Sequence, residues 1–106
     1  MRQFDVHRFV GRSASIRPYL VIVQSNLFAR HDRWLAIPIV HRGAFSGTPD
    51  RILNPAFQIE GAPMALDTLD LASFPQQAFG RRVCSLEDGS DRIVAALDLA
   101  MARGYG

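Results

Sequence analysis

Tyr19–Ser25 reads YLVIVQS and Trp34–Val40 reads WLAIPIV, and these two stretches indicate the fold class more clearly than any other part of the chain. Each has the length of a β-strand, is rich in β-branched or aromatic residues and is flanked by polar or turn residues. The polar interruption at 30–33 predicts that the two pair as a hairpin. Because Pro38 has no amide hydrogen, we expect an edge or a bulge there.

Both alternating sets of side chains are apolar along Leu20–Val23 and along Trp34–Val40. An antiparallel sheet that faces water on one side needs only one apolar set. We therefore expect the second face of this sheet to be covered as well.

An earlier strand is predicted at Gln3–Val10, where apolar and polar residues alternate. Phe4 and Val6 fall on one face and Asp5 and His7 on the other, a pattern typical of a half-buried strand. The Gly-, Ser- and Pro-containing segments 11–18 and 43–49 are expected to form loops.

The other predicted strands are Ala56–Glu60 and Pro63–Asp67, which form a hairpin around Gly61-Ala62, and a last strand at Arg82–Leu86. Phe57 and Ile59 share one face of the hairpin. Residues 69–75 are expected to be irregular or to form a single turn, because Pro75 biases Phe74 away from the helical conformation.

From Ser90 the apolar period changes to three and four residues, which predicts a helix with one apolar stripe. The stripe consists of Ile93, Leu97, Ala100 and Met101. The expected terminal signals are Ser90 as N-cap, Asp91 at the positive end of the helix dipole, Arg103 at the negative end and Gly104 just after the last turn.

Length and composition favour one domain over residues 1–106. A chain of 106 residues that is 48% hydrophobic removes roughly two thirds of its unfolded-state surface from water on folding. The longest uninterrupted apolar run, Tyr19–Val23, is far shorter than the ~20 residues that cross a bilayer, and no basic-then-apolar leader precedes it. Cys84 is the only cysteine, so no intramolecular disulfide can form. We expect a soluble, unprocessed cytoplasmic protein without membrane partners.

All twelve basic residues are arginine, and the formal net charge is +2. The codon bias of a GC-rich genome explains such a set without any function. The alternative is that some of these planar guanidinium groups recognise carboxylates or phosphates.

No motif in the chain indicates a catalyst or a metal site. The three histidines lack a second histidine or a carboxylate at metal-ligand spacing, which favours surface or structural roles. The chain has no nucleophile elbow, P-loop or dinucleotide-binding glycine motif. Cys84 is most simply a small core residue, although a thiol facing one of the two neighbouring arginines would be acidified. We predict no cofactor, no metal and no enzymatic activity.

Several short motifs follow one another in a characteristic order: QFDV at 3–6, VIVQS at 21–25, AIP at 36–38, NP at 54–55, IEG at 59–61, DLASFP at 70–75, Gly80, Val83 and a closing helix. In this order the chain resembles the CcdB family, the toxin half of type II toxin–antitoxin pairs. The resemblance covers essentially the whole chain, and its register holds without gaps from Gln24 to Gly104. The most specific string is DLASFP.

The resemblance implies a mainly β (α+β) fold: a small twisted antiparallel sheet, partly closed like SH3-like barrels, with a short second sheet and a carboxy-terminal helix. It also implies a homodimer that binds the GyrA subunit of DNA gyrase and traps the enzyme on cleaved DNA. A cognate antitoxin with a disordered tail would neutralise it, and DNA would be contacted only through the antitoxin complex. The symmetric dimer would cover the second sheet face, while Ala100 and Met101 belong either to that interface or to the core of one subunit.

In the best-known family members the helix ends in Trp-Gly-Ile, and the tryptophan stacks on a gyrase arginine. The ungapped register places Ala102, Arg103 and Gly104 at these positions. Either the chain slides by one residue and Tyr105 becomes the aromatic anchor, or Tyr105 and Gly106 form a disordered terminus. The gyrase-facing residues implied by the resemblance are Phe4, Ser25, Leu27, Asp98, Ala102, Arg103, Gly104 and Tyr105.

For the antitoxin, the arginines of the loops at 8–17 and 42–51 are the candidates, because an antitoxin tail is usually acidic and orders on binding. They are Arg8, Arg12, Arg17, Arg42 and Arg51.

Two other functions stay open. The related MazF-like toxins use the same fold as endoribonucleases, which requires an acid or base beside a cation, for example Arg17 with His41. A non-toxic dimeric relative would keep the antitoxin and act with it at an operator.

Overall fold

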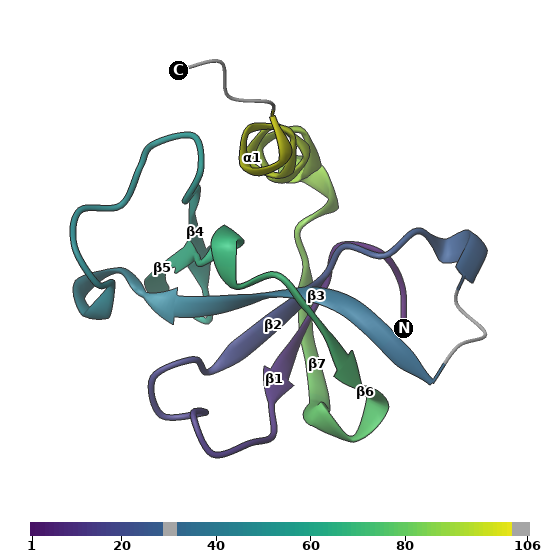
Figure 1. Ribbon diagram of the computed structural model, residues 1–106. Coiled ribbons are helices and arrows are strands. Elements are labelled where there is room, and N and C mark those ends of the chain that lie inside the picture. The colour runs from purple at the N-terminus through teal and green to yellow at the C-terminus, as the bar shows by residue number, and fades with distance from the viewer. Residues whose placement is uncertain (29–31, 103–106) are drawn as a thin grey trace.

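The computed structural model describes residues 1–28 and 32–102. Within them the elements are β1 (Asp5–Phe9), β2 (Tyr19–Ile22), β3 (Arg33–His41), β4 (Ala56–Ile59), β5 (Ala62–Leu66), β6 (Ala72–Pro75), β7 (Phe79–Ser85) and α1 (Ser90–Met101). All pairings are antiparallel, in the order β4-β5-β3-β2-β1-β7, and β6 also pairs with β3 (Figure 1). The sheet curls into a half-barrel, and the predicted mainly β fold with a closing helix is confirmed.

Strand β3 is shared by the two parts of the sheet. The predicted hairpin with β2 is confirmed along Tyr19–Ile22. On the other side of β3, β6 pairs with Arg33–Ala36 and β5 with Ile39–His41. Pro38 lies between these partners, and its carbonyl accepts a hydrogen bond from the Asp67 amide at 2.9 Å.

The edge or bulge expected at Pro38 is therefore wrong, because β3 is a central strand. The amide and carbonyl of a strand residue point to the same side. The missing amide hydrogen of Pro38 thus falls in the gap where β6 ends and β5 begins, and no ladder bond is lost there.

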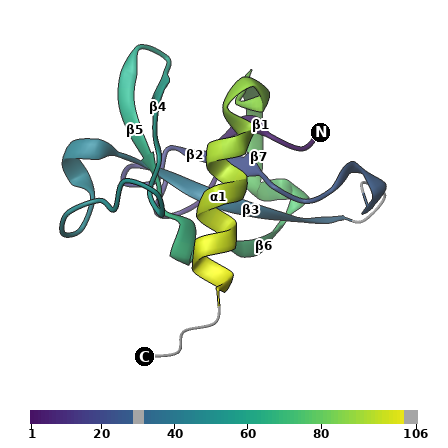
Figure 2. The ribbon, with the colours of Figure 1, turned by 90° about the horizontal axis from the view of Figure 1, so that it is seen from above.

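Helix α1 lies across one face of the sheet (Figures 1 and 2). From the predicted stripe, Ile93 is fully buried and Leu97 packs partly buried against the same core cluster, which includes Phe57 and Leu66. Met101 is 74% exposed, so it does not complete the core of one chain, and its place in a dimer interface stays a prediction. Among the described residues, no helix has both the length and the apolar character that crossing a membrane requires.

The second apolar face of β2 and β3 is covered from within the chain. Leu20 and Ala36 are fully buried there against Ala78, and Phe74 of β6 and Phe79 of β7 pack onto them. The expected second covered face is confirmed, but a partner subunit is not needed to cover it.

Strand β1 is buried on both faces, so the prediction that Asp5 and His7 face water is wrong. The His7 ring donates through Nδ1 to the carbonyl of Gly80 at 2.9 Å, which fixes its tautomer, and packs edge-on against Phe79. Asp5 forms an ion pair with Arg82 at 3.3 Å. Strand β7 pairs with β1, and its residues Phe79 and Arg82 contact His7 and Asp5 on the face that the alternating pattern assigned to solvent.

Residues 69–75 are more regular than expected. A 3₁₀ turn at Thr68–Asp70 agrees with the single-turn alternative, but Ala72–Pro75 then forms strand β6. The bias that Pro75 imposes on the preceding residue excludes helix and suits an extended strand equally well. Strand β7 also begins three residues earlier than predicted, at Phe79.

Ser90 is the first helical residue rather than the N-cap, with φ −62° and ψ −29°. A 3₁₀ turn, Glu87–Gly89, runs directly into α1, and Gly89 occupies the cap position. A Cβ at Gly89 would lie 2.7 Å from Cε1 of Phe57, so close packing of the helix start on β4 requires glycine there. Asp91 lies in the first turn as expected, and the signals at Arg103 and Gly104 lie outside the described residues.

We expect the substitution Ile93→Ala to lower the free energy of unfolding by about 2–5 kcal/mol, because it removes a fully buried side chain between helix and sheet. The control Val94→Ala, at a side chain 46% exposed, should cost less than about 1 kcal/mol. Urea unfolding followed by circular dichroism measures both. Equal losses would contradict the helix packing described above.

Candidate partner-binding sites

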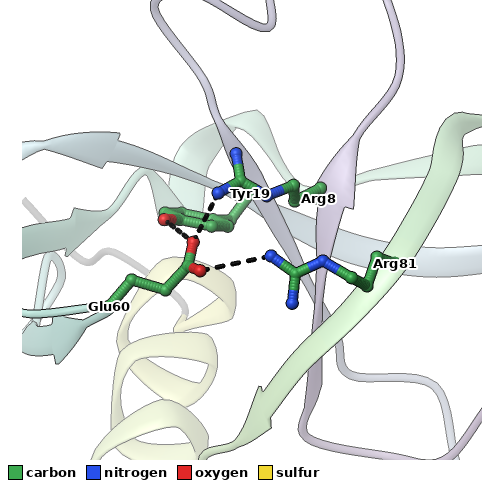
Figure 3. Close-up of polar contacts among 4 residues, drawn as sticks. All are labelled: Arg8, Tyr19, Glu60 and Arg81. Carbon is green, nitrogen blue, oxygen red and sulfur yellow. Dashed lines mark hydrogen bonds and ion pairs between the residues drawn. The ribbon is translucent and has the colours of Figure 1, made fainter.

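A cluster of four polar side chains joins the β4–β5 hairpin to the rest of the sheet (Figure 3). The Glu60 carboxylate accepts hydrogen bonds from the Tyr19 hydroxyl at 2.5 Å, from Arg8 at 2.8 Å and from Arg81 at 3.2 Å. Glu60 lies in the hairpin turn, where it and Gly61 have φ values of 50° and 78°. Positive φ at both central residues is the signature of a type I′ turn. The predicted hairpin is confirmed, but its turn is Glu60-Gly61, one residue earlier than the expected Gly61-Ala62.

The contacts in this cluster favour the ionised form of Glu60 and the neutral form of Tyr19. The hydrogen bond from Tyr19, together with Arg81 and Arg8, lowers the pKa of Glu60 below its usual value. Burial, and then Glu60 itself, raises the pKa of the Tyr19 hydroxyl. Arg8 also lies over the Tyr19 ring, 5.7 Å from its centroid. Arg8 is therefore committed to contacts within the chain.

Arg17 is also held internally. Its guanidinium binds the Asp70 carboxylate and lies 3.8 Å from that of Asp67. Burial and the nearby Asp70 raise the pKa of Asp67. Arg17 therefore offsets the repulsion between two neighbouring carboxylates, and this explains its position without any partner.

The other three antitoxin candidates differ from this pair. Arg12, Arg42 and Arg51 are exposed, and no ion pair involves them within residues 1–28 and 32–102. Arg42 and Arg51 line one cavity of about 450 Å³, whereas Arg12 lies in the 11–18 loop. The structure thus separates the five candidates into two that are internally paired and three that are free to meet a partner.

Three of the predicted gyrase-facing residues lie where the N-terminal segment meets the 3₁₀ turn at 26–28: Phe4, Ser25 and Leu27. Phe4 packs partly buried against the core cluster. The amide of Gln3 next to it donates to Asn26 Oδ1 at 2.8 Å, which ties this segment to the 3₁₀ turn Asn26–Phe28. Ser25 accepts a hydrogen bond from the Leu27 amide, and the Leu27 side chain is 84% exposed.

The remaining gyrase-facing residues belong to another element. Asp98 and Ala102 are exposed on and just after α1. The turn at 26–28 projects apart from α1 in both views (Figures 1 and 2). Arg103, Gly104 and Tyr105 lie outside the described residues.

A protein-family model described as "CcdB protein" matches residues 3–103. The chain belongs to the CcdB family. This confirms the resemblance drawn from the short motifs, and the family is one of toxins from toxin–antitoxin pairs that act as inhibitors rather than as catalysts. No curated protein matched the chain.

The geometry of this CcdB-family chain argues against the ribonuclease pair of Arg17 with His41 and against an acidified Cys84 thiol. The Arg17 guanidinium is occupied by two aspartates, so it is not the free cation that the ribonuclease alternative placed beside His41. Burial raises the pKa of the Cys84 thiol, and the lowering of this pKa by the charge of Arg82 is smaller. The alternative that a neighbouring arginine acidifies this thiol is therefore wrong. Within the described ranges, no group of three or more His, Cys, Asp or Glu side chains is placed to hold a metal ion.

Arg92 lines the same cavity as Arg42 and Arg51. Sequence reasoning missed Arg92, and it also missed Glu60 and Arg81 as members of the polar cluster. A buried tyrosine needs a partner for its hydroxyl, so Tyr19 in an apolar run was a signal for Glu60. Arg92 gave no signal, because nothing in the sequence shows that the first turn of α1 lies against β4.

The variant Glu60→Gln should be less stable than the unaltered protein at about pH 7, and the difference should shrink near pH 3. The pKa of Glu60 is lowered by folding, so its contribution is present above the unfolded value and lost as pH falls through the folded one. Urea unfolding at both pH values measures the difference. Glu87→Gln is the control, since Glu87 is exposed and outside the cluster. A difference that does not change with pH would contradict the charge–charge origin.

The variant Arg17→Ala should lose up to about 1 kcal/mol of unfolding free energy near neutral pH, because the two carboxylates then face each other. The loss should fall as the pH drops and Asp67 is protonated. Arg12→Ala should change stability by less than about 0.5 kcal/mol. Thermal melts of both variants give the comparison, and an equal effect would show that the Arg17 pairs contribute nothing.

Proposed function

We propose that this protein is the toxin of a type II toxin–antitoxin pair that binds the GyrA subunit of DNA gyrase and traps the cleaved-DNA complex. The observation that carries the proposal is the match of residues 3–103 to the CcdB family. The exposed positions at Leu27, Asp98 and Ala102 support it, because a surface that binds a large partner must be accessible.

The proposed toxin is a single domain over residues 1–106 that works as a homodimer in the cytoplasm, where gyrase acts. It uses no cofactor and makes no covalent bond. A cognate antitoxin neutralises it, and the toxin reaches operator DNA only as part of that complex. Because the second sheet face is already covered within one chain, the dimer rests on family membership alone. Light scattering tests it directly, and a monomeric mass at micromolar concentration would contradict it.

The contact with gyrase differs from that of the best-known members, since Ala102 stands where they carry tryptophan. Loss of a central aromatic anchor commonly costs 2 kcal/mol or more, which is roughly thirtyfold in affinity. Tyr105 is the aromatic residue that we propose in its place. The exposed side chain of Leu27 supplies a second apolar contact in this proposal.

The test mixes gyrase, ATP, closed circular DNA and this protein, and measures linear DNA after denaturation of the enzyme. We expect linear DNA to accumulate, and growth arrest on expression that a GyrA-arm resistance substitution relieves. Loss of intact messenger RNA without DNA cleavage would favour a ribonuclease. Normal growth of the wild-type strain would favour the non-toxic relative.

The variant Leu27→Asp should need about ten times more protein for the same cleavage, equal to about 1.4 kcal/mol of binding free energy. A charge at this 84% exposed position removes an apolar contact without disturbing the core. Ile16→Asp is the matched control at a side chain 58% exposed in another loop. If the two variants cleave equally well, Leu27 does not contact gyrase.

A further inference from the structure

Two hollows lie beside each other where the segment at 42–55 meets the β4–β5 hairpin and the first turn of α1. The larger one encloses about 450 Å³ and has three arginines in its wall, Arg42, Arg51 and Arg92. The smaller one encloses about 220 Å³ and is lined by Ile52, Pro55 and Ala95. Arg51 and Arg92 belong to both walls, so these two guanidinium groups separate a cationic hollow from an aliphatic one.

The cationic hollow has an excess of unpaired positive charge. Asp50 is an acidic residue in its wall, but Asp50 Oδ1 already accepts hydrogen bonds from the amides of Ile52 and Leu53 at 2.9 and 2.8 Å. Arg42 and Arg51 take part in no ion pair within residues 1–28 and 32–102. This distinguishes them from Arg8 and Arg17, whose charges are neutralised within the chain.

The wall is held in place before any ligand arrives. Arg92 donates to the carbonyl of Ala56 at 2.8 Å, and its guanidinium lies over the Phe57 ring at 4.0 Å. Asn54 is buried and holds the loop between Asp50 and β5, since it accepts from the Asp50 amide at 2.9 Å and donates to the carbonyl of Leu66 at 3.0 Å. Arg51 therefore extends from a fixed loop, which reduces the entropy lost on binding.

We propose that the paired hollows bind an acidic segment of a partner protein, with a carboxylate against Arg51, Arg92 and Arg42 and a neighbouring aliphatic side chain on Ile52, Pro55 and Ala95. Planar guanidinium groups suit carboxylates because they can donate two parallel hydrogen bonds. The inference rests on the proposed function, since a tail that is acidic and orders on binding is the part of an antitoxin with this chemistry. It assigns a role to Arg92, which the sequence did not indicate.

The same surface fits a nucleic acid less well. Single-stranded nucleic acids use exposed aromatic rings as stacking platforms. The lining of the smaller hollow is aliphatic, and the Phe57 ring next to it is covered by Arg92. These features favour an acidic peptide.

The test titrates a terminally blocked synthetic peptide of alternating glutamate and leucine into isotope-labelled full-length protein, followed by NMR of backbone amides and arginine side chains. We expect saturable shifts confined to 42–55 and the first turn of α1. A peptide with glutamine for glutamate should not bind, and one with alanine for leucine should bind severalfold more weakly. Shifts centred elsewhere would overturn the proposal.

Variants then separate the site from general charge attraction. Arg51→Glu should weaken the peptide at least tenfold, whereas Arg2→Glu should not. Arg2 is also exposed, and the N-terminal end lies across the molecule from the 42–55 segment in both ribbon views. Equal losses in the two variants would reject a defined site. Ile52→Gln should weaken the leucine peptide and leave the alanine peptide unchanged; an equal effect on both would reject the aliphatic half of the site.

A single-stranded RNA of the same charge is titrated in parallel. Tighter saturable binding of the RNA at the same residues would overturn the assignment to a peptide. Gyrase trapping is measured separately on the unaltered protein. Peptide shifts at the hollows without trapping would uphold this inference and reject the gyrase function, and trapping with shifts elsewhere would do the opposite.

Discussion

The sharing of β3 between β6 and β5 is the constraint on which the rest of the structure depends. A proline at Pro38 would interrupt any ladder on that side, and the chain places the change of partner at this point. One half of β3 therefore carries β6 and the other half carries the β4–β5 hairpin. This arrangement curls the sheet and brings the hairpin beside α1, where Phe57 and Ile93 belong to one core cluster (Figure 2).

The same arrangement decides which apolar groups remain available for partners. Phe74 and Phe79 cover Leu20 and Ala36, so the second face of the sheet belongs to the interior of one chain. Most of the large apolar side chains that remain exposed lie on turns and on the helix, as Leu27 and Met101 do, and Leu35 is an exposed one on β3. A partner of this protein meets such isolated positions together with charged loops rather than an open sheet face.

The arginines near Glu60, near Asp70 and in the cationic hollow have different physical roles. Arg8 and Arg81 converge on Glu60 and hold the hairpin to the opposite part of the sheet, while Arg17 keeps Asp67 and Asp70 together. Exposed pairs of this kind stabilise a fold only modestly, and they also neutralise the charges that a partner would otherwise meet. Arg42 and Arg51 form no ion pair within residues 1–28 and 32–102, and they line one hollow together with Arg92.

The sequence by itself determined that strands lie within 19–25 and along 34–40, that a hairpin lies within 56–67, and that a helix closes the chain. It also determined the family. Periodicity and short ordered motifs can be read directly from the order of residues. The sequence could not determine that Asp5 and His7 are buried, that 72–75 is a strand or that Arg8 and Arg17 are internally paired. Each of these depends on a neighbour far away along the chain, such as Gly80 for His7 or Glu60 for Arg8. Only the tertiary structure decides which side chains meet, because burial and ion pairing are fixed when distant strands pack together.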